Sequence, residues 1–126
     1  MERLRLTLRL QAVAFAVYGV AFLLAPDFTM GDVFGWDGTQ TMFIRIIGGL
    51  FLVLAWFDWA VAERLGERLD LVWALVLAPV LILLVAVVQR LAGKYDGTES
   101  FYWASIAVAG FFAVTVGGLR LGVARR

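Results

Sequence analysis

Two charged side chains, Arg45 and Asp58, lie in the otherwise apolar stretch "TMFIRIIGGLFLVLAWFDWAVAE" at residues 41–63. Charges are costly inside a membrane. They are kept there for an ion or proton relay, for a contact with another subunit, or as ion pairs that hold helices in register. On one helix these two side chains are ~20 Å apart along the axis and ~140° apart around it. They therefore cannot pair with each other, and each needs a neighbour of opposite charge.

The neighbours expected for the two charges differ. Arg45 lies about one turn inside one end of its segment, so a carboxylate from the loops at that end is the expected partner. The candidate carboxylates are Asp27, Asp32 and Asp37 in one loop and Asp96 and Glu99 in another. Asp58 lies about one turn inside the other end, where Arg9 or Arg120 is expected at a similar depth.

We interpret each charge as one half of an ion pair that attaches this helix to a neighbour. The two neighbours differ, and one of them could belong to another chain. An ion or proton relay is the alternative interpretation. It is less favoured because no charged side chain lies in the middle third of any expected membrane span.

Missing residue types exclude several kinds of chemistry. The 126 residues include no cysteine and no histidine, which excludes disulfides, thiolate catalysis, thiol–metal sites and histidine acid–base chemistry. No P-loop, dinucleotide glycine pattern, HExxH or GxSxG motif is present. The net charge of +1 provides no basic field for nucleic acid. We therefore expect no catalytic residues, no metal site, no cofactor and no nucleic-acid partner.

The composition indicates a membrane protein. Hydrophobic residues make up 63% of the chain and the mean hydropathy is +0.90. A soluble domain of this length cannot bury so much apolar surface. Four segments are long enough to cross the bilayer as helices: about Leu6–Ala25, Thr41–Ala62, Leu71–Leu91 and Ser100–Leu121. The sequence predicts an all-α fold, a single four-helix transmembrane domain over residues 1–126 with up-down-up-down order.

The distribution of basic residues predicts the orientation. One side of the membrane would carry eight arginines: Arg3, Arg5, Arg9, Arg64, Arg68, Arg120, Arg125 and Arg126. The other side would carry three basic residues: Arg45, Arg90 and Lys94. By the positive-inside rule both termini are cytoplasmic, in a multi-pass protein of the cell (inner) membrane. The first apolar run has no small-residue cleavage site after it and is expected to remain as a helix.

The first outer loop, "PDFTMGDVFGWDGTQ" at residues 26–40, is unusually apolar. It contains the three aspartates named above, no base, and five large apolar side chains: Phe28, Met30, Val33, Phe34 and Trp36. We expect it to lie in the interface as a short helix or to pack over the mouth of the bundle. A ligand lid or a docking element for a partner is the alternative. The acids lack the spacing of a calcium loop, so no metal site is predicted.

Small residues and two special side chains suggest how the helices pack. Stripes of small residues predict helix contacts at Ala12, Ala16 and Gly19, at Gly48 and Gly49, and at Ala107, Gly110, Ala113 and Gly117. The hydroxyl of Tyr18 needs a partner, which can be a neighbouring backbone group or the head group of a ligand. Pro79 removes one N–H from its helix and frees the carbonyl of Leu75, so a kink is expected there.

The first half of the chain resembles a known group of small bacterial membrane proteins. An arginine opens the first span in "LRLQAVAFAVYGVAFLLAPDF", which has a mid-helix glycine and ends in Leu-x-x-Pro, and the second span contains "RIIGG". This pattern is similar to DoxX-like and related four-helix families over about residues 5–60. The resemblance implies a four-helix bundle in which Arg45 and Gly48–Gly49 are a structural signature. It implies a role as an accessory component of a membrane complex and no particular activity.

These observations favour a non-enzymatic membrane protein, an accessory or assembly subunit of a larger complex. Its partners would be the lipid bilayer and either another membrane protein or further copies of the same chain. The alternative is a small carrier or a lipid- or quinone-binding protein, with a pocket under the first outer loop. Groups such as Tyr18, Arg45, Trp56 or Trp103 would line that pocket. A membrane enzyme acting on a lipid is a third class, which would need mid-membrane acids that this chain lacks.

Overall fold

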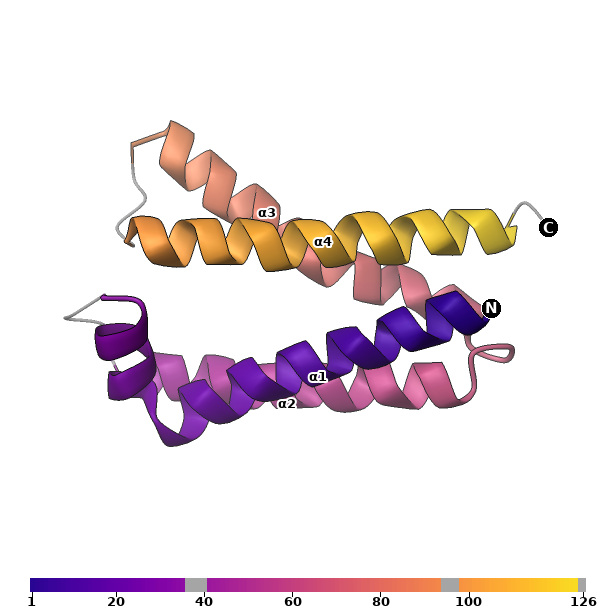
Figure 1. Cartoon of the computed structure of the whole chain (residues 1–126), viewed down its shortest axis with the longest axis horizontal. Helices are drawn as coiled ribbons and strands as arrows, with labels where there is room; N and C mark the ends of the chain where they lie inside the picture. Colours follow the sequence, from indigo (N-terminus) through magenta and orange to yellow (C-terminus); the bar gives the residue numbers. More distant parts are fainter. Residues whose placement is uncertain (36–40, 94–97, 125–126) are drawn as a thin grey trace.

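The structure is a computed structural model, and it describes residues 1–35, 41–93 and 98–124. In chain order its elements are α1 (Glu2–Leu24), the π-helical turn η1 (Phe28–Val33), α2 (Thr41–Glu63), the 3-10 turn η2 (Leu69–Leu71), α3 (Val72–Leu91) and α4 (Glu99–Ala124). All regular structure in the described residues is helical, which confirms the predicted all-α class (Figure 1).

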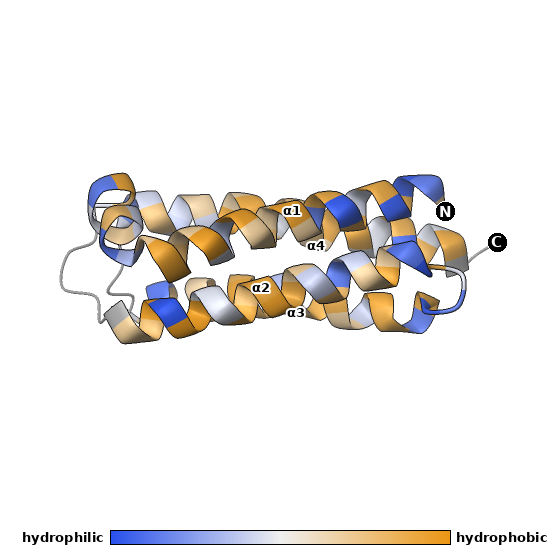
Figure 2. Cartoon of the chain, turned by 90° about the horizontal axis from the view of Figure 1, so that it is seen from below, coloured by the Kyte–Doolittle hydropathy of each residue, from blue (hydrophilic) through white to orange (hydrophobic). Residues whose placement is uncertain are grey.

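The four long helices have the length and composition needed to cross a membrane. They begin and end within a few residues of the predicted spans, except that α1 begins four residues earlier than expected. The charged first turn continues the helix because its side chains find partners: Glu2 pairs with Arg5 at 2.6 Å, and Arg5 Nε donates to the Ala62 carbonyl at 3.0 Å. Figure 2 shows long apolar stretches along the helices and polar residues mainly toward their ends.

Neighbouring helices run antiparallel, and the bundle consists of two pairs (Figures 1 and 2). Helix α1 packs on α2 and α3 packs on α4, and these are the two most extensive contacts in the described part of the chain. Helix α1 also contacts α4, whereas α2 and α3 barely touch. Both termini lie at one end of the bundle, called here the termini end, and η1 lies at the other, the η1 end.

At the termini end all four helices share one apolar core. Its buried members are Leu4, Leu8, Val61, Ala62, Leu65, Val72, Leu75, Phe112 and Val116. This core joins the two pairs to each other. The only connection in sequence between the pairs, the segment from α2 to α3, lies at the same end (Figure 1).

Inside the first pair, two glycines let α1 and α2 cross at very short range. A Cβ added at Gly48 would lie 2.7 Å from the Leu23 backbone nitrogen and 2.8 Å from the Gly19 carbonyl oxygen. A Cβ added at Gly19 would lie 2.8 Å from the Gly48 carbonyl oxygen. The crossing therefore requires glycine on both helices. In contrast, nothing lies within 4 Å of a Cβ added at Gly49, so the second glycine of "RIIGG" takes no part in it.

The small-residue stripe predicted on the fourth span packs only at its last member, Gly117, which is buried and where an added Cβ would lie 3.6 Å from Val76 Cγ1 of α3. Ala107 is exposed, and a Cβ added at Gly110 would meet nothing within 4 Å. Helix α4 instead buries Ala109, Phe112 and Val116. Because α4 is apolar on all sides, its sequence gave little contrast between the buried and the lipid-facing side.

Candidate functional site

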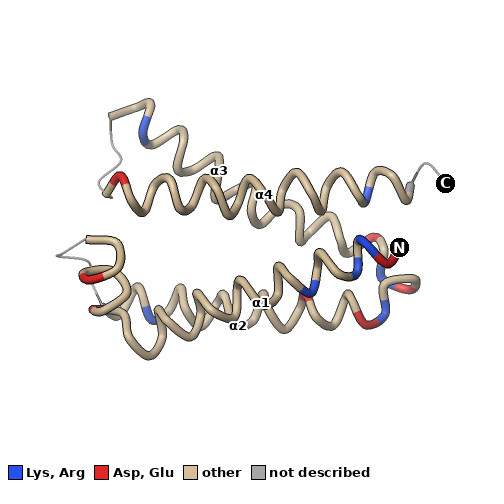
Figure 3. The backbone as a smooth tube through the Cα atoms, in the orientation of Figure 1, with Lys and Arg blue, Asp and Glu red and all other residues tan. Residues whose placement is uncertain are grey.

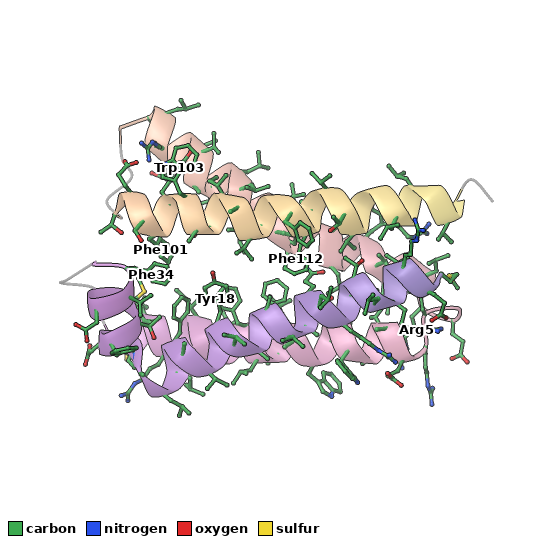
Figure 4. All side chains as sticks on the ribbon, viewed as in Figure 1. Arg5, Tyr18, Phe34, Phe101, Trp103 and Phe112 are labelled. Carbon is green, nitrogen blue, oxygen red and sulfur yellow. The ribbon has the colours of Figure 1, made fainter. Side chains whose placement is uncertain are left out.

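A cavity of about 730 Å³ lies between the two pairs, in the half of the bundle toward η1. All four helices and η1 contribute to its lining, with Gln11, Ala14, Phe15, Tyr18, Phe22, Met30, Ile44, Ile47, Phe51, Pro79, Leu81, Ile82, Val85, Ala86, Gln89, Phe101, Ser105, Val108, Ala109 and Phe112. Figure 4 shows Tyr18 of α1 and Phe112 of α4 pointing into the space between the pairs. The position under η1 is where the alternative interpretation of the sequence, a lipid- or quinone-binding protein, placed a ligand pocket.

One wall of the cavity is a cluster of aromatic rings on α1 and α2. Phe15, Tyr18 and Phe22 follow one another at helical spacing and face the same side of α1. Their rings lie 5.5, 6.4 and 5.9 Å from the ring of Phe51 on α2. Contacts between rings at these distances hold the wall in place without filling the space in front of it.

The opposite wall of the cavity is formed by α3 and α4, and small side chains in this wall leave the cavity space open. Ala86 of α3 and Ala109 of α4 are both buried and both line the cavity. A larger side chain at either position would enter the space. Ile47 of α2 and Leu81 of α3 also line the cavity and are 40% and 50% exposed, so the cavity opens between the two helices that barely touch.

The turn η1 closes the cavity at its end. Met30 of η1 is buried and lines the cavity. The ring of Phe34 meets the ring of Phe101 edge-on at 5.2 Å, and Thr98 Oγ1 donates to the Phe34 carbonyl at 2.7 Å (Figure 4). These contacts attach η1 to the beginning of α4, so the first loop packs over the mouth of the bundle, as one sequence interpretation had it.

The acidic residues of this loop do not converge on the cavity. Asp27 and Asp32 are exposed, and neither lines the cavity. Asp37 lies outside the described residues. No group of three or more metal-binding side chains occurs in the part of the chain that the structure describes.

Gln11 and Pro79 meet at the end of the cavity farthest from η1. Pro79 has no N–H to give to the carbonyl of Leu75, four residues earlier in α3. Gln11 Nε2 donates to this carbonyl at 3.1 Å. The sequence predicted the freed carbonyl but not its partner. Gln11 Oε1 is buried and has no hydrogen-bond partner in the described part of the chain.

The described lining carries no charged side chain. Its polar members are Gln11, Tyr18, Gln89 and Ser105. The Tyr18 hydroxyl forms no hydrogen bond with any described residue, so the backbone partner considered for it is not found there, and Figure 4 shows its ring extending into the space between the pairs. The cavity is thus an apolar space with a few neutral polar groups, which is the usual make-up of a small-molecule site.

Asp58 is buried in the bundle and lacks the partner expected for it. The carboxylate is 0% exposed, and neither oxygen has a hydrogen-bond partner in the described residues. Arg9 pairs with Glu63 at 2.6 Å and lies over the ring of Trp59 at 5.3 Å. The prediction that Arg9 neutralises Asp58 is therefore wrong.

The second predicted partner of Asp58 is also occupied elsewhere. Arg120 Nε donates to the Leu69 carbonyl at 2.9 Å, and the guanidinium lies 5.4 Å from the centre of the Trp73 ring. Long arginine side chains place their charged ends toward polar or aromatic groups at the helix end. Figure 3 shows that charged residues gather near the two ends of the bundle.

Arg45 is exposed and forms no hydrogen bond or ion pair within the described residues. Glu99, one of its predicted partners, pairs instead with Arg90 at 2.8 Å. Of the four groups expected to line a pocket, Tyr18 does so, whereas Arg45, Trp56 and Trp103 do not. These three side chains face outward on α2 and α4.

Several cavity residues were not singled out in the sequence, including Phe51, Ala86 and Ala109. Their helical spacing was visible, but nothing in it distinguished a cavity wall from a packed core. No protein-family model, curated protein or solved structure matches the chain. The resemblance to DoxX-like proteins therefore stays a prediction.

Proposed function

We propose that this chain is a non-enzymatic, multi-pass membrane protein that binds an apolar, lipid-like molecule of the lipid or quinone class in the cavity under η1. The cavity carries the proposal. Its volume of about 730 Å³ lies within the ~300–1,000 Å³ of typical ligand sites, and its lining is almost wholly apolar.

The position of the opening supports the same proposal. The cavity opens sideways between α2 and α3, in the η1 half of helices that are long and apolar enough to cross a membrane. In a bilayer this side meets the hydrocarbon, so a lipid-like molecule reaches the site without crossing water. The basic residues favour both termini on the cytoplasmic side of the cell (inner) membrane, which would place η1 on the outer side.

Native mass spectrometry after mild solubilisation tests the proposal, with two alanine variants of α4 as a matched pair. Ala109→Phe fills the cavity, whereas Ala107→Phe adds the same ring on the exposed side two residues away. We expect a small molecule of fixed mass on the wild type and on Ala107→Phe, and none on Ala109→Phe. A wild type without any retained molecule, or equal retention by both variants, contradicts the proposal.

A second candidate function is an accessory or assembly subunit of a larger membrane complex. The favouring observation is α3, whose exposed side is a continuous run of large aliphatic residues: Leu77, Leu81, Leu84, Val85, Val88 and Leu91. Such a face can pack on another membrane protein. In the same experiment, recovery of the chain with larger subunits at fixed stoichiometry supports this function, and recovery of the chain alone contradicts it.

A further inference from the structure

We infer that the ligand of the cavity binds with its head group inward. A neutral head group accepts hydrogen bonds from the hydroxyls of Tyr18 and Ser105, and its hydrocarbon chain leaves the cavity between α2 and α3. The inference rests on the proposed function, because it specifies the head group and the orientation of the molecule that fills the same cavity. It follows from two hydroxyls within reach of a ligand, from their common depth and from the apolar residues at the opening.

Tyr18 of α1 and Ser105 of α4 each present a hydroxyl to the cavity. Both side chains line the cavity and are half-buried. Both hydroxyl oxygens lack a hydrogen-bond partner among the described residues, yet neither oxygen is fully buried, so a molecule in the cavity can reach them. Figure 4 shows the Tyr18 ring extending into the space between the two helix pairs.

Ser105 differs from two threonines of the bundle in leaving its hydroxyl unused. A serine or threonine inside a helix can donate to the carbonyl four residues earlier. Thr7 donates in this way to the Arg3 carbonyl at 2.8 Å, and Thr115 donates to the Phe111 carbonyl at 2.6 Å. Ser105 forms no such bond in the described part of the chain. Its O–H is therefore available to a molecule in the cavity.

The two hydroxyls lie at the same depth in the bundle. Leu4 of α1 and Leu119 of α4 line one small pocket at the termini end, so they mark a common level of these antiparallel helices. Tyr18 lies 14 residues after Leu4 (18 − 4), and Ser105 lies 14 residues before Leu119 (119 − 105). Each is therefore ~21 Å from that level along its helix, toward η1. A head group at this depth can meet both hydroxyls.

The surroundings favour a neutral head group with an oxygen that accepts hydrogen bonds. The described lining contains no lysine, arginine, aspartate or glutamate. A carboxylate or phosphate would lose its hydration there without gaining an opposite charge, which is far more costly than burying a neutral polar group. The ion pair of Glu99 with Arg90 is no substitute, because Glu99 lies six residues before Ser105 (105 − 99), ~9 Å along α4. A neutral oxygen supplies the acceptor that each unpaired O–H needs.

The opening of the cavity determines the direction of the chain. Ile47 of α2 and Leu81 and Val85 of α3 line the cavity and are 40%, 50% and 60% exposed. These three side chains at the opening are aliphatic, whereas the two unpaired hydroxyls belong to α1 and α4. A hydrocarbon chain can pass the aliphatic opening and continue into the lipid without burying a polar group. The head group therefore lies against α1 and α4, and the chain lies between α2 and α3.

The test is a ligand titration of the full chain in detergent, read by native mass spectrometry. The probe is methyl oleate, and the reference is octadecene, which has a similar chain and no oxygen. Each ligand is compared between a variant and the wild type, so its partitioning into detergent cancels. Tyr18→Phe and Ser105→Ala should each weaken binding of methyl oleate ~2-fold to ~10-fold, the effect of one net hydrogen bond, and leave binding of octadecene unchanged. Both variants remove a hydroxyl that has no partner within the described protein, so the fold should be kept.

Two control variants make the test specific. Thr115→Val removes a hydroxyl of α4 that does not line the cavity, and Gln89→Leu removes an exposed amide of the lining near the η1 end of α3. Neither should change the binding of methyl oleate. A loss in Gln89→Leu but not in Tyr18→Phe and Ser105→Ala would place the head group at the η1 end and overturn the inference. A loss in only one of the two hydroxyl variants, or in neither, also overturns it.

Photolabelling tests the orientation, and further ligands identify the source of the oxygen. Analogues of methyl oleate carry a diazirine either beside the ester or at the far end of the chain. The first should label α1 or α4 and the second α2, α3 or the surrounding detergent, and the reverse pattern overturns the inference. Oleyl alcohol and decylubiquinone are titrated in the same variants, and the ligand that the two hydroxyl variants weaken most names an ester, an alcohol or a quinone. Binding of octadecene without any effect of the hydroxyl variants on the oxygen ligands overturns the inference while the proposed function stands. Binding of no ligand at all overturns the proposed function itself.

Discussion

The crossing of α1 and α2 at Gly19 and Gly48 leads to a prediction about two adjacent glycines. Gly48→Ala should destabilise the protein, whereas Gly49→Ala should be neutral or stabilising. A Cβ at Gly48 would lie 2.7 Å from the Leu23 nitrogen and 2.8 Å from the Gly19 carbonyl oxygen. Both are backbone atoms, so neither can move aside unless a whole helix shifts.

The magnitude follows from comparing the two substitutions. Each replaces a helical glycine by alanine and gains the same helix propensity, up to ~1 kcal/mol. Only Gly48→Ala adds an atom where there is no room, and overpacking typically costs ~1–3 kcal/mol. The free energies of unfolding of the two variants should therefore differ by ~1–3 kcal/mol, toward the upper end because the contacted atoms belong to the backbone.

Unfolding in mixed micelles, followed by circular dichroism, measures this difference. Gly19→Ala provides a further check, since its Cβ would lie 2.8 Å from the Gly48 carbonyl oxygen. Because the two glycines meet at one crossing, the double variant should lose less stability than the sum of the single losses. The reasoning fails if Gly48→Ala is as stable as Gly49→Ala.

Three further substitutions have predicted effects on stability or dynamics. Asp58→Asn should raise the free energy of unfolding at neutral pH by about 1 kcal/mol or more, because it removes a buried carboxylate that has no hydrogen-bond partner, and thermal denaturation in detergent measures the gain. Gln11→Leu should cost about 1 kcal/mol in the wild type and almost nothing beside Pro79→Ala, which a double-mutant cycle of unfolding free energies checks. Thr98→Val should speed amide hydrogen exchange in η1, because the hydroxyl that donates to the Phe34 carbonyl is lost.

Control variants show whether these effects depend on the burial and the hydrogen bonds of the substituted residues or follow from the same substitution at any site. Asp70 is exposed, so Asp70→Asn should leave stability unchanged, and a gain as large as that of Asp58→Asn would refute the burial argument. Thr115 Oγ1 donates only to the Phe111 carbonyl within its own helix, so Thr115→Val should not alter exchange in η1. Equal cost of Gln11→Leu with and without Pro79 would show that the Leu75 carbonyl is not the partner that matters.

The sequence predicted the helices well because each is a long apolar run that ends at polar residues. It also identified Gly48 and the free carbonyl behind Pro79, since both follow from local geometry. Gly49 was grouped with Gly48, although a shift of one residue turns a side chain ~100° around the helix. Only the placement of α1 beside α2 decides which glycine faces the crossing.

The candidate site was much less predictable. Arg9 was at the right depth to reach Asp58, but a long flexible side chain has several partners within range, and Glu63 at the helix end is better hydrated than a buried carboxylate. The cavity depends on the distance between two pairs of helices, and no single helix encodes that distance. Gln11 and Pro79 are 68 positions apart in the chain (79 − 11). Only the folded molecule shows that Gln11 donates to the Leu75 carbonyl, which Pro79 leaves without its usual N–H donor.

The single link in sequence between the two pairs has a consequence for synthesis of the protein. Helices α1 and α2 are consecutive, so they can complete their glycine crossing while α3 is still being translated. Each pair then resembles a separate insertion unit, and the ligand space does not exist until the second unit docks on the first. A molecule that binds in this space binds only the docked form. By mass action it therefore shifts the docking equilibrium of the two pairs toward the assembled bundle. The amount of mature protein in a membrane would then follow the supply of its ligand.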